Sequence, residues 1–183
     1  MALSQPHDDS NYDDISSPPV NTEISRPTKR RLNSTDAIQV PFDDETTIQM
    51  DLMRSQPADY TITVMFPGEH SPILETTSVN GKLAQPVMEF NGCTVVNGIV
   101  DEATGQTVFP DGIAVTQSDK NDAGAKVTQM VLHYKDTNYT IISRVEGDDY
   151  VAKIERTKDG VTESVRFAAV DQNPCVTYQK LQA

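Results

Sequence analysis

The last third of the chain constrains the fold most, because it reads as a run of strands joined by very short turns. In four segments apolar and polar residues alternate with the period of two that is typical of a half-buried strand. These segments are Lys126–Tyr134, Tyr139–Val145, Tyr150–Arg156 and Thr162–Val170. A connection of a few polar residues cannot carry the chain back for parallel pairing, so successive strands must be antiparallel. We therefore expect a β-meander in this part of the protein.

Earlier in the chain, alternating apolar residues and turn dipeptides indicate further strands. The segment Tyr60–Phe66 places four apolar side chains on one face. Asn80-Gly81 is typical of a tight hairpin, and Asn97-Gly98 predicts either a hairpin or a β-bulge. Asp111-Gly112 predicts a turn, and a last strand is expected over Cys175–Gln179.

Residues 38–53 are compatible with two structures. Ile38, Val40 and Phe42 alternate with polar residues, and the same alternation recurs over residues 48–52, which favours strands. The helical alternative would use Asp43 or Asp44 as the N-cap, with one apolar face following it. We favour strands.

The fold class that follows is all-β. We expect an antiparallel β-sandwich or β-barrel over residues 38–183, with the meander at its C-terminal end; both architectures consist of short strands at regular spacing, so the sequence does not separate them. Residues 1–37 are rich in Ser, Asp, Asn and Pro and contain only isolated apolar residues. Such a segment cannot bury enough apolar surface to offset its ordering entropy, so a disordered tail is expected.

Charge and composition limit the partners. The formal net charge is −12, and a negative domain repels the phosphate backbone, so nucleic acid is expected to bind only indirectly or through residues 26–31. No apolar run reaches the length of a membrane span, and the first residues do not resemble a signal peptide, so no membrane partner is expected. Cys93 and Cys175 lack metal-ligand spacing.

Motifs of catalysis and cofactor binding are not found in the sequence. It contains no nucleophile elbow, zinc-protease motif, phosphate loop or dinucleotide fingerprint. Residues 119–130 resemble a calcium-binding loop, but Ala123 and Met130 stand where oxygen ligands are required. Glu69-His70-Ser71 places an acid, an imidazole and a hydroxyl in succession, and neighbours in sequence rarely converge in space. We expect no enzyme and no cofactor.

A basic hexapeptide, residues 26–31, stands inside the acidic tail. The candidate residues for nuclear import are Arg26, Lys29, Arg30 and Arg31. An import receptor binds extended chain with spaced Lys and Arg, so a disordered location favours recognition. A solvated charge cluster in a cytoplasmic protein, or an anchor for nucleic acid, are the alternatives. We predict a nuclear location.

Two serines of the tail are candidates for phosphorylation. Ser34 follows Arg31 at a spacing typical of kinases that prefer basic residues, and phosphate there would weaken import by adding negative charge. Ser17 lies in Ser16-Ser17-Pro18, which resembles the phosphorylated motif that Polo-box domains read. The tail is therefore expected to be phosphorylated.

Aromatic and branched residues of the meander suggest an interaction face. The candidate residues are Tyr134, Tyr139, Ile141, Ile142 and Tyr150. Core packing is the alternative interpretation of the same residues. Ile141 and Ile142 are successive, so a regular strand turns one towards the core and the other away from it.

The sequence thus favours a non-catalytic nuclear protein-interaction module. It would bind a protein partner, or a second copy of itself, through a sheet edge or a sheet face. The alternatives are a subunit of a nucleic-acid-associated complex of chromatin or telomeres, and a viral structural β-sandwich protein.

Overall fold

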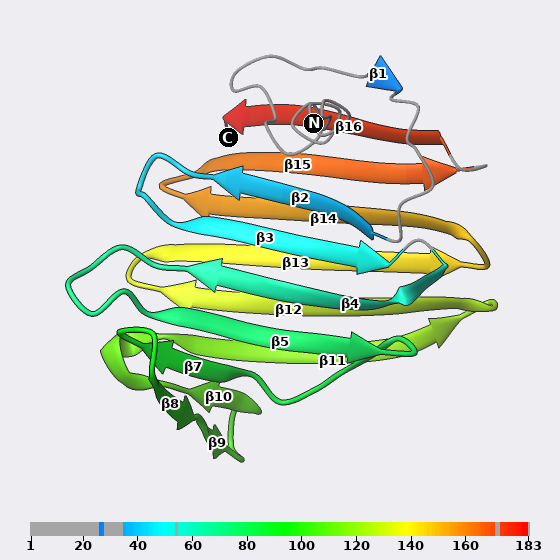
Figure 1. Ribbon diagram of the computed structural model, residues 1–183. Coiled ribbons are helices and arrows are strands. Elements are labelled where there is room, and N and C mark those ends of the chain that lie inside the picture. Colours follow the sequence, from blue (N-terminus) through cyan, green and yellow to red (C-terminus); the bar gives the residue numbers. More distant parts are fainter. Residues whose placement is uncertain (1–25, 28–34, 54, 171–172, 183) are drawn as a thin grey trace, which may run out of the picture.

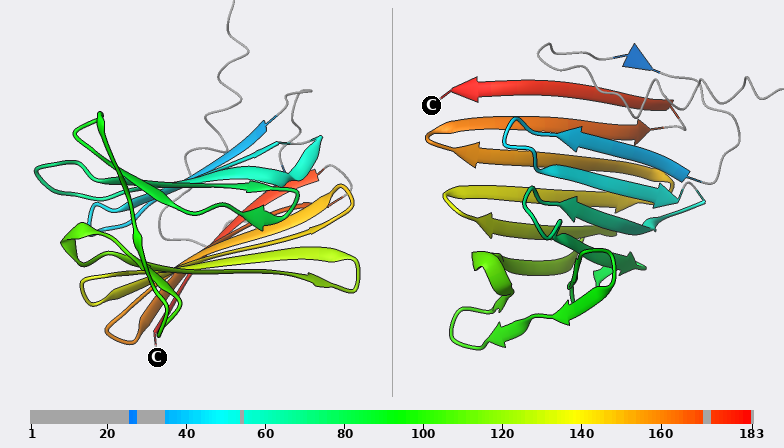
Figure 2. Two further views of the ribbon diagram at one scale, coloured as in Figure 1. Left: turned by 90° about the horizontal axis from the view of Figure 1, so that it is seen from below. Right: turned by 60° about the vertical axis from the view of Figure 1, so that its left-hand side comes forward.

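Two antiparallel β-sheets pack face to face in the computed structural model, which describes residues 26–27, 35–53, 55–170 and 173–182 (Figure 1). Most of the predicted tail lies outside these residues. Seen from below, in the left panel of Figure 2, the two sheets form separate layers. The predicted all-β antiparallel fold is confirmed.

The nine-stranded sheet is built almost entirely from the second half of the chain. Its strands in spatial order are β1 (Arg26–Pro27), β16 (Asn173–Gln182), β15 (Val161–Val170), β14 (Asp149–Lys158), β13 (Thr137–Glu146), β12 (Ala125–Tyr134), β11 (Ala114–Asp122), β10 (Gln106–Val108) and β9 (Ile99–Asp101). From β9 to β16, each strand lies beside the next one in the chain. The predicted meander is therefore confirmed, and it extends from four strands to eight.

The seven-stranded sheet is a second meander, formed by the first half of the chain. Its strands in spatial order are β2 (Thr35–Pro41), β3 (Thr47–Met53), β4 (Gln56–Met65), β5 (Ile73–Val79), β7 (Val87–Phe90) and β8 (Thr94–Asn97), with β6 (Lys82–Leu83) paired to β5. Strands β2 and β3 confirm the strand interpretation of residues 38–53, and the helical alternative is wrong. The Asn80-Gly81 hairpin is also confirmed, between β5 and β6.

The dipeptide Asn97-Gly98 has a role that was not predicted from the sequence. It forms neither a hairpin nor a bulge, because the chain passes here from β8 in one sheet to β9 in the other. A Cβ atom at Gly98 would lie 2.3 Å from Cγ2 of Thr107 and 2.8 Å from Cζ of Phe109, so only glycine fits this crossing. At the opposite side β2 and β16 are not paired with each other among the described strands. The fold is therefore a sandwich and not a closed barrel.

The core lies between the two sheets and follows the period of two along each strand. In β4, Tyr60, Ile62 and Val64 are buried and the residues between them are half-buried, as the alternation predicts. The largest fully buried side chains include Tyr139 and Phe167 from the nine-stranded sheet. Apolar burial of this kind stabilises the fold by roughly 25 cal/mol per Å².

Candidate functional site

Strand β16 presents the longest edge of the nine-stranded sheet. All ten of its residues pair with β15, from Val161 opposite Gln182 to Val170 opposite Asn173. On its other side, the only described strand is β1, which reaches Cys175 and Val176 and no further. The remainder of this edge, from Thr177 onward, therefore faces no other strand of the described part of the chain.

Strand β1 shows that this edge accepts an added strand. It runs antiparallel to β16, with Arg26 opposite Val176 and Pro27 opposite Cys175 (Figure 1). A strand displays the N–H and C=O groups of alternate residues at each of its two edges. The edge of β16 therefore offers a backbone pattern that a further extended segment can match.

The proline within β16 indicates which residues display their backbone at the open edge. Pro174 has no N–H, and proline inside a sheet is confined to positions whose N–H side faces away from a partner strand. Residues that are an even number of positions from Pro174 share its direction. The backbone groups of Tyr178 and Lys180 therefore face the open edge, whereas those of Gln179 face β15.

The inward face of β16 is held by a hydrogen bond from Tyr178. This side chain packs against the core, and its hydroxyl donates to Oε1 of Glu163 on β15 at 2.7 Å. Burial and the hydrogen bond to the Glu163 carboxylate raise the pKa of Tyr178 to about 12. The hydroxyl therefore remains a donor throughout the physiological range of pH.

A buried arginine continues this network towards the other sheet. Arg156 on β14 is 6% exposed, and its guanidinium donates to the Glu163 carboxylate, which is itself 7% exposed. The same guanidinium donates to Oδ1 of Asp43 at 2.5 Å and lies 3.5 Å from Oδ2 of Asp44. The hydrogen bond from Arg156 lowers the pKa of Asp43 below its ordinary value.

The loop between β2 and β3 completes the network. The Tyr139 hydroxyl on β13 donates to Oδ2 of Asp44 at 2.5 Å, and Oδ1 of Asp44 accepts from the backbone N–H of Thr46 at 3.0 Å. Burial and the bond to Asp44 raise the pKa of Tyr139 well above its ordinary value. The Phe42 ring lies 5.2 Å from the Arg156 guanidinium and 5.7 Å from the Tyr139 ring.

This polar cluster links β13, β14, β15 and β16 to the β2–β3 loop of the opposite sheet. It therefore holds β16 in place against the rest of the sandwich. This cluster was not predicted from the sequence. A signal was present, because Arg156 and Glu163 occupy inward positions of their strands, where alternation predicts apolar residues. A charged residue at such a position requires a buried partner.

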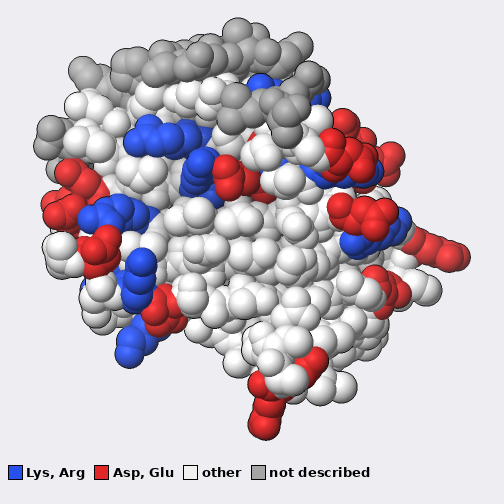
Figure 3. All heavy atoms as spheres, turned by 180° about the vertical axis from the view of Figure 1, so that it is seen from behind, with Lys and Arg blue, Asp and Glu red and all other residues white. Residues whose placement is uncertain are grey.

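The outward face of the nine-stranded sheet is a second accessible surface. Uncharged residues occupy its middle, and Lys, Arg, Asp and Glu gather around them (Figure 3). Across β11, β12 and β13, Thr116, Val131 and Thr140 form one row, and Ile142 lies beside Gln129 in the next. Ile142 is half-buried, so part of its side chain is accessible.

The five residues predicted to form an interaction face do not share a face. Tyr139, Ile141 and Tyr150 are buried between the sheets. Tyr134 also points inward, where its ring contacts the Phe66 ring at a centroid distance of 4.8 Å. Only Ile142 points outward, because its parity along the strand is opposite to that of its neighbours. Core packing therefore explains the other four residues.

The residues predicted for import and phosphorylation lie mostly outside the described part of the chain. Arg26 is in β1, beside the β16 edge. Lys29, Arg30, Arg31, Ser17 and Ser34 lie outside the described residues. Their roles stay predictions.

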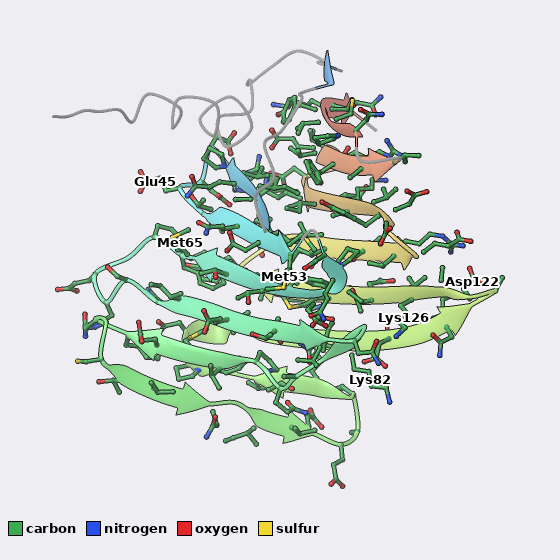
Figure 4. All side chains as sticks on the ribbon, turned by 45° about the vertical axis from the view of Figure 1, so that its right-hand side comes forward. Glu45, Met53, Met65, Lys82, Asp122 and Lys126 are labelled. Atoms are coloured by element: carbon green, nitrogen blue, oxygen red, sulfur yellow. The ribbon has the colours of Figure 1, made fainter. Side chains whose placement is uncertain are left out.

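Shallow clefts occur at both ends of the sandwich. Lys126, which lines one of them, lies close to the turn between β11 and β12 (Figure 4). One, of about 310 Å³, is lined by the β4–β5 loop with Glu69 and His70, and by Asp111, Tyr134 and Lys135. The other, of about 460 Å³, is partly lined by Asp59, Asn80, Lys126 and Asp148. In the second cleft the polar groups partner one another: the Lys126 ammonium donates to Asn80, and the Asn80 N–H donates to Asp59 at 2.6 Å.

Within the ranges that the structure describes, no group of three or more His, Cys, Asp or Glu is placed to hold a metal ion. Over the same residues, no helix has the length and hydropathy needed to cross a membrane. The Asp119–Gly124 segment, which resembles a calcium loop, forms the end of β11 and the turn that follows it.

Comparison of the chain with protein-family models, with curated proteins and with solved structures finds no match.

Proposed function

We propose that this protein is a non-catalytic interaction module of the nucleus, which binds an extended segment of a protein partner as an added strand on the β16 edge. The observation that supports it is the asymmetry of β16, which pairs along all ten residues with β15 but, within the described part of the chain, with only the two residues of β1 on its other side. An added strand gains affinity from main-chain hydrogen bonds, and pockets for alternate side chains give specificity.

The edge also indicates what kind of segment it would take. The inward side beyond β1 presents Tyr178, which packs on the core, so a partner side chain beside it should be aromatic or β-branched. The outward side presents Thr177 and Gln179, which suit polar neighbours. The preferred partner is therefore an extended segment in which apolar and polar residues alternate.

The nuclear part of the proposal is supported by the basic cluster of residues 26–31. Replacing Lys29, Arg30 and Arg31 together by Ala should move a tagged protein towards the cytoplasm without changing its melting temperature, because these residues precede the described strand β2. Undiminished nuclear accumulation of this triple variant would reject the import role.

Three variants of β16 test the docking edge in the full chain. Lys180→Pro removes an N–H that faces the edge, Lys180→Ala removes only the side chain, and Gln179→Pro removes an N–H that faces β15. Each is used as bait in nuclear extract, alongside the wild-type chain, and its melting temperature is measured.

We expect Lys180→Pro to lose the captured partner and to keep a melting temperature near that of the wild type. Lys180→Ala should keep both capture and stability. Gln179→Pro should lower the melting temperature, because it breaks the β15–β16 ladder. If Lys180→Pro captures the same proteins as the wild type, the edge is not the binding surface.

A further inference from the structure

We infer that the cleft of about 310 Å³ beside the β4–β5 loop is a binding site for an alkylammonium group, such as the side chain of a lysine or a free amine. We call it the Tyr134 cleft, after the aromatic residue in its lining. It is separate from the β16 edge, so the inference goes beyond the proposed function and does not depend on it.

Three connections between strands meet at the Tyr134 cleft, on the left-hand side of Figure 1. They are the β4–β5 loop, the turn Pro110–Gly112 that precedes β11, and the turn between β12 and β13. The β4–β5 loop is closed by the Phe66 N–H, which donates to the Pro72 carbonyl at 2.9 Å. The Phe109 N–H likewise donates to the Ile113 carbonyl at 2.8 Å across the second connection. The cleft is therefore preformed, as most ligand sites are.

The less exposed part of the lining is apolar or aromatic. It consists of the buried Pro72 and the half-buried Pro67 and Tyr134. The Tyr134 ring is held by the Phe66 ring, which meets it edge to face at a centroid distance of 4.8 Å.

The Tyr134 ring already holds an ammonium group. The Lys135 Nζ lies over this ring, 5.1 Å from its centroid. An aromatic face attracts a cation that lies within about 6 Å of its centroid. The neighbouring residue of the chain thus occupies the position that a ligand's ammonium would take.

The exposed part of the lining supplies negative charge. It carries the carboxylates of Glu69 and Asp111, together with His70 and Lys135. Within the residues that the structure describes, neither carboxylate forms a hydrogen bond or an ion pair, and Lys135 forms no ion pair. Two unpaired carboxylates beside a ring that accepts an ammonium favour a cationic ligand.

The other cleft shows the contrast. There the Lys126 ammonium donates to the Asn80 side chain, and the Asp59 carboxylate accepts from the Asn80 N–H, so its charged groups are already engaged. The net charge of −12 also acts in favour of a cation, because it raises the concentration of positive ligands near the surface.

Lys135 makes the sign of the ligand testable. A cationic ligand must displace its ammonium from the Tyr134 ring, and a competing internal group lowers the apparent affinity. Removing Lys135 should therefore tighten the binding of a cation. An anionic ligand would instead lose its positive partner.

Amide NMR of the ¹⁵N-labelled full chain provides the measurement, since it gives both the location and the affinity of a weak ligand. Four probes are titrated. They are a tripeptide with blocked ends and a central lysine, the same peptide with norleucine in place of lysine, butylamine, and inorganic phosphate. Norleucine keeps the alkyl chain and lacks the ammonium.

We expect the lysine peptide and butylamine to shift the amides of Gly68 and Asp111 saturably, and the norleucine peptide and phosphate to leave them unchanged. Equal affinity for the lysine and norleucine peptides, or no shift at these amides, would overturn the inference. Where both amines bind, tighter binding of the peptide identifies a protein lysine as the ligand, and equal binding identifies the amine alone.

Lys135→Ala should bind the lysine peptide about threefold more tightly than the wild type. Lys120→Ala is the matched control, because it removes the same charge near the opposite end of the β11–β12 hairpin and should leave the affinity unchanged. Weaker binding of the lysine peptide by Lys135→Ala, or phosphate binding that this variant loses, would make the cleft an anion site and reject the inference.

Two further variants test the ring and the carboxylates. Tyr134→Leu keeps an apolar side chain and should weaken the binding of the lysine peptide about threefold. Glu69→Gln combined with Asp111→Asn should weaken it about tenfold, and its melting temperature should match the wild type because both side chains are exposed. Undiminished binding by the folded double variant would refute the site. Lys180→Pro should bind the lysine peptide as the wild type does, so failure of the β16 edge leaves this inference standing.

Discussion

The two edges of the nine-stranded sheet differ in what they offer a partner. Strand β9 has three residues and carries Ile99, which is 77% exposed, yet its backbone ends at once in a turn where the Asp101 carbonyl accepts from the Gly105 N–H at 2.7 Å. Strand β16 has ten residues and carries no such exposed apolar side chain among those described. Its inward face is anchored through Tyr178 and Glu163.

The comparison distinguishes two properties of an edge strand. One is how much apolar side chain it exposes, and the other is how many backbone hydrogen bonds it can offer to an added strand. Short edge strands are one of the ways in which proteins avoid edge-to-edge association, because they offer few backbone hydrogen bonds. A long edge offers many of them, and β1 already uses two positions of β16. We therefore regard backbone length, rather than exposed side chains, as the feature that marks the proposed binding edge of this sheet.

Substitutions in the centre of the sheet should have the largest effect on stability, and they provide the reference for substitutions at both edges. Ile141 is 1% exposed and faces the core, whereas Ile142 on the same strand faces out. Ile141→Asp should unfold the domain, because it buries an unpaired charge in addition to losing the roughly 2–5 kcal/mol of an Ile side chain.

Ile142→Asp is the matched control and should fold, as thermal melting will show. Its capture of partner decides whether the outward face contributes to binding beside the β16 edge. Two variants that both fold normally would contradict the assignment of β13.

Removing the arginine beneath the β16 edge should have the next largest effect. Arg156→Ala leaves the buried Glu163 carboxylate without its cationic partner, which costs about 3–5 kcal/mol in comparable buried pairs. Lys153→Ala, on the outward face of the same strand, breaks an exposed pair with Glu155 and should cost less than about 1 kcal/mol. Chemical denaturation measures the free energy of unfolding of both variants. Equal losses of stability would mean that the polar cluster around Arg156 does not stabilise the β16 edge.

High pH should loosen β16 and leave β9 unaffected. The Tyr178 hydroxyl keeps its proton up to a pKa of about 12, against an ordinary value of 10.0, so its contribution is fully present below pH 10 and is lost as the pH rises towards 12. In the alkaline range the wild type should therefore lose stability more steeply than Tyr178→Phe. Superimposable pH profiles of melting temperature would show that this hydroxyl contributes nothing.

The smallest effect is expected at β9. Ile99→Asp replaces an exposed side chain, so it should change the free energy of unfolding by no more than about 0.5 kcal/mol. It should also capture as much partner as the wild type. Loss of capture by Ile99→Asp, together with normal capture by Lys180→Pro, would reverse the comparison and make β9 the binding edge.

The sequence predicted local features better than the site. The meander, the strands over residues 38–53 and the inward face of residues 60–66 all follow from an alternation that is visible within a few residues. The interaction face failed for four of its five residues because it selected aromatic and branched side chains without regard to parity along each strand. The crossing at Gly98 was missed because a hairpin and a change of sheet use the same dipeptide.

By itself, the sequence determined that the chain forms antiparallel strands and which side chains of each strand face inward, since both depend on the period of the backbone and on short turns. Only the tertiary structure decided that the strands form a sandwich, that β16 pairs on its outer side with just two residues of the described part of the chain, and that a polar cluster lies next to it. These features depend on pairs that are distant in sequence: Arg156 and Asp43 are separated by 113 residues. Local alternation carries no information about which distant strand supplies the partner.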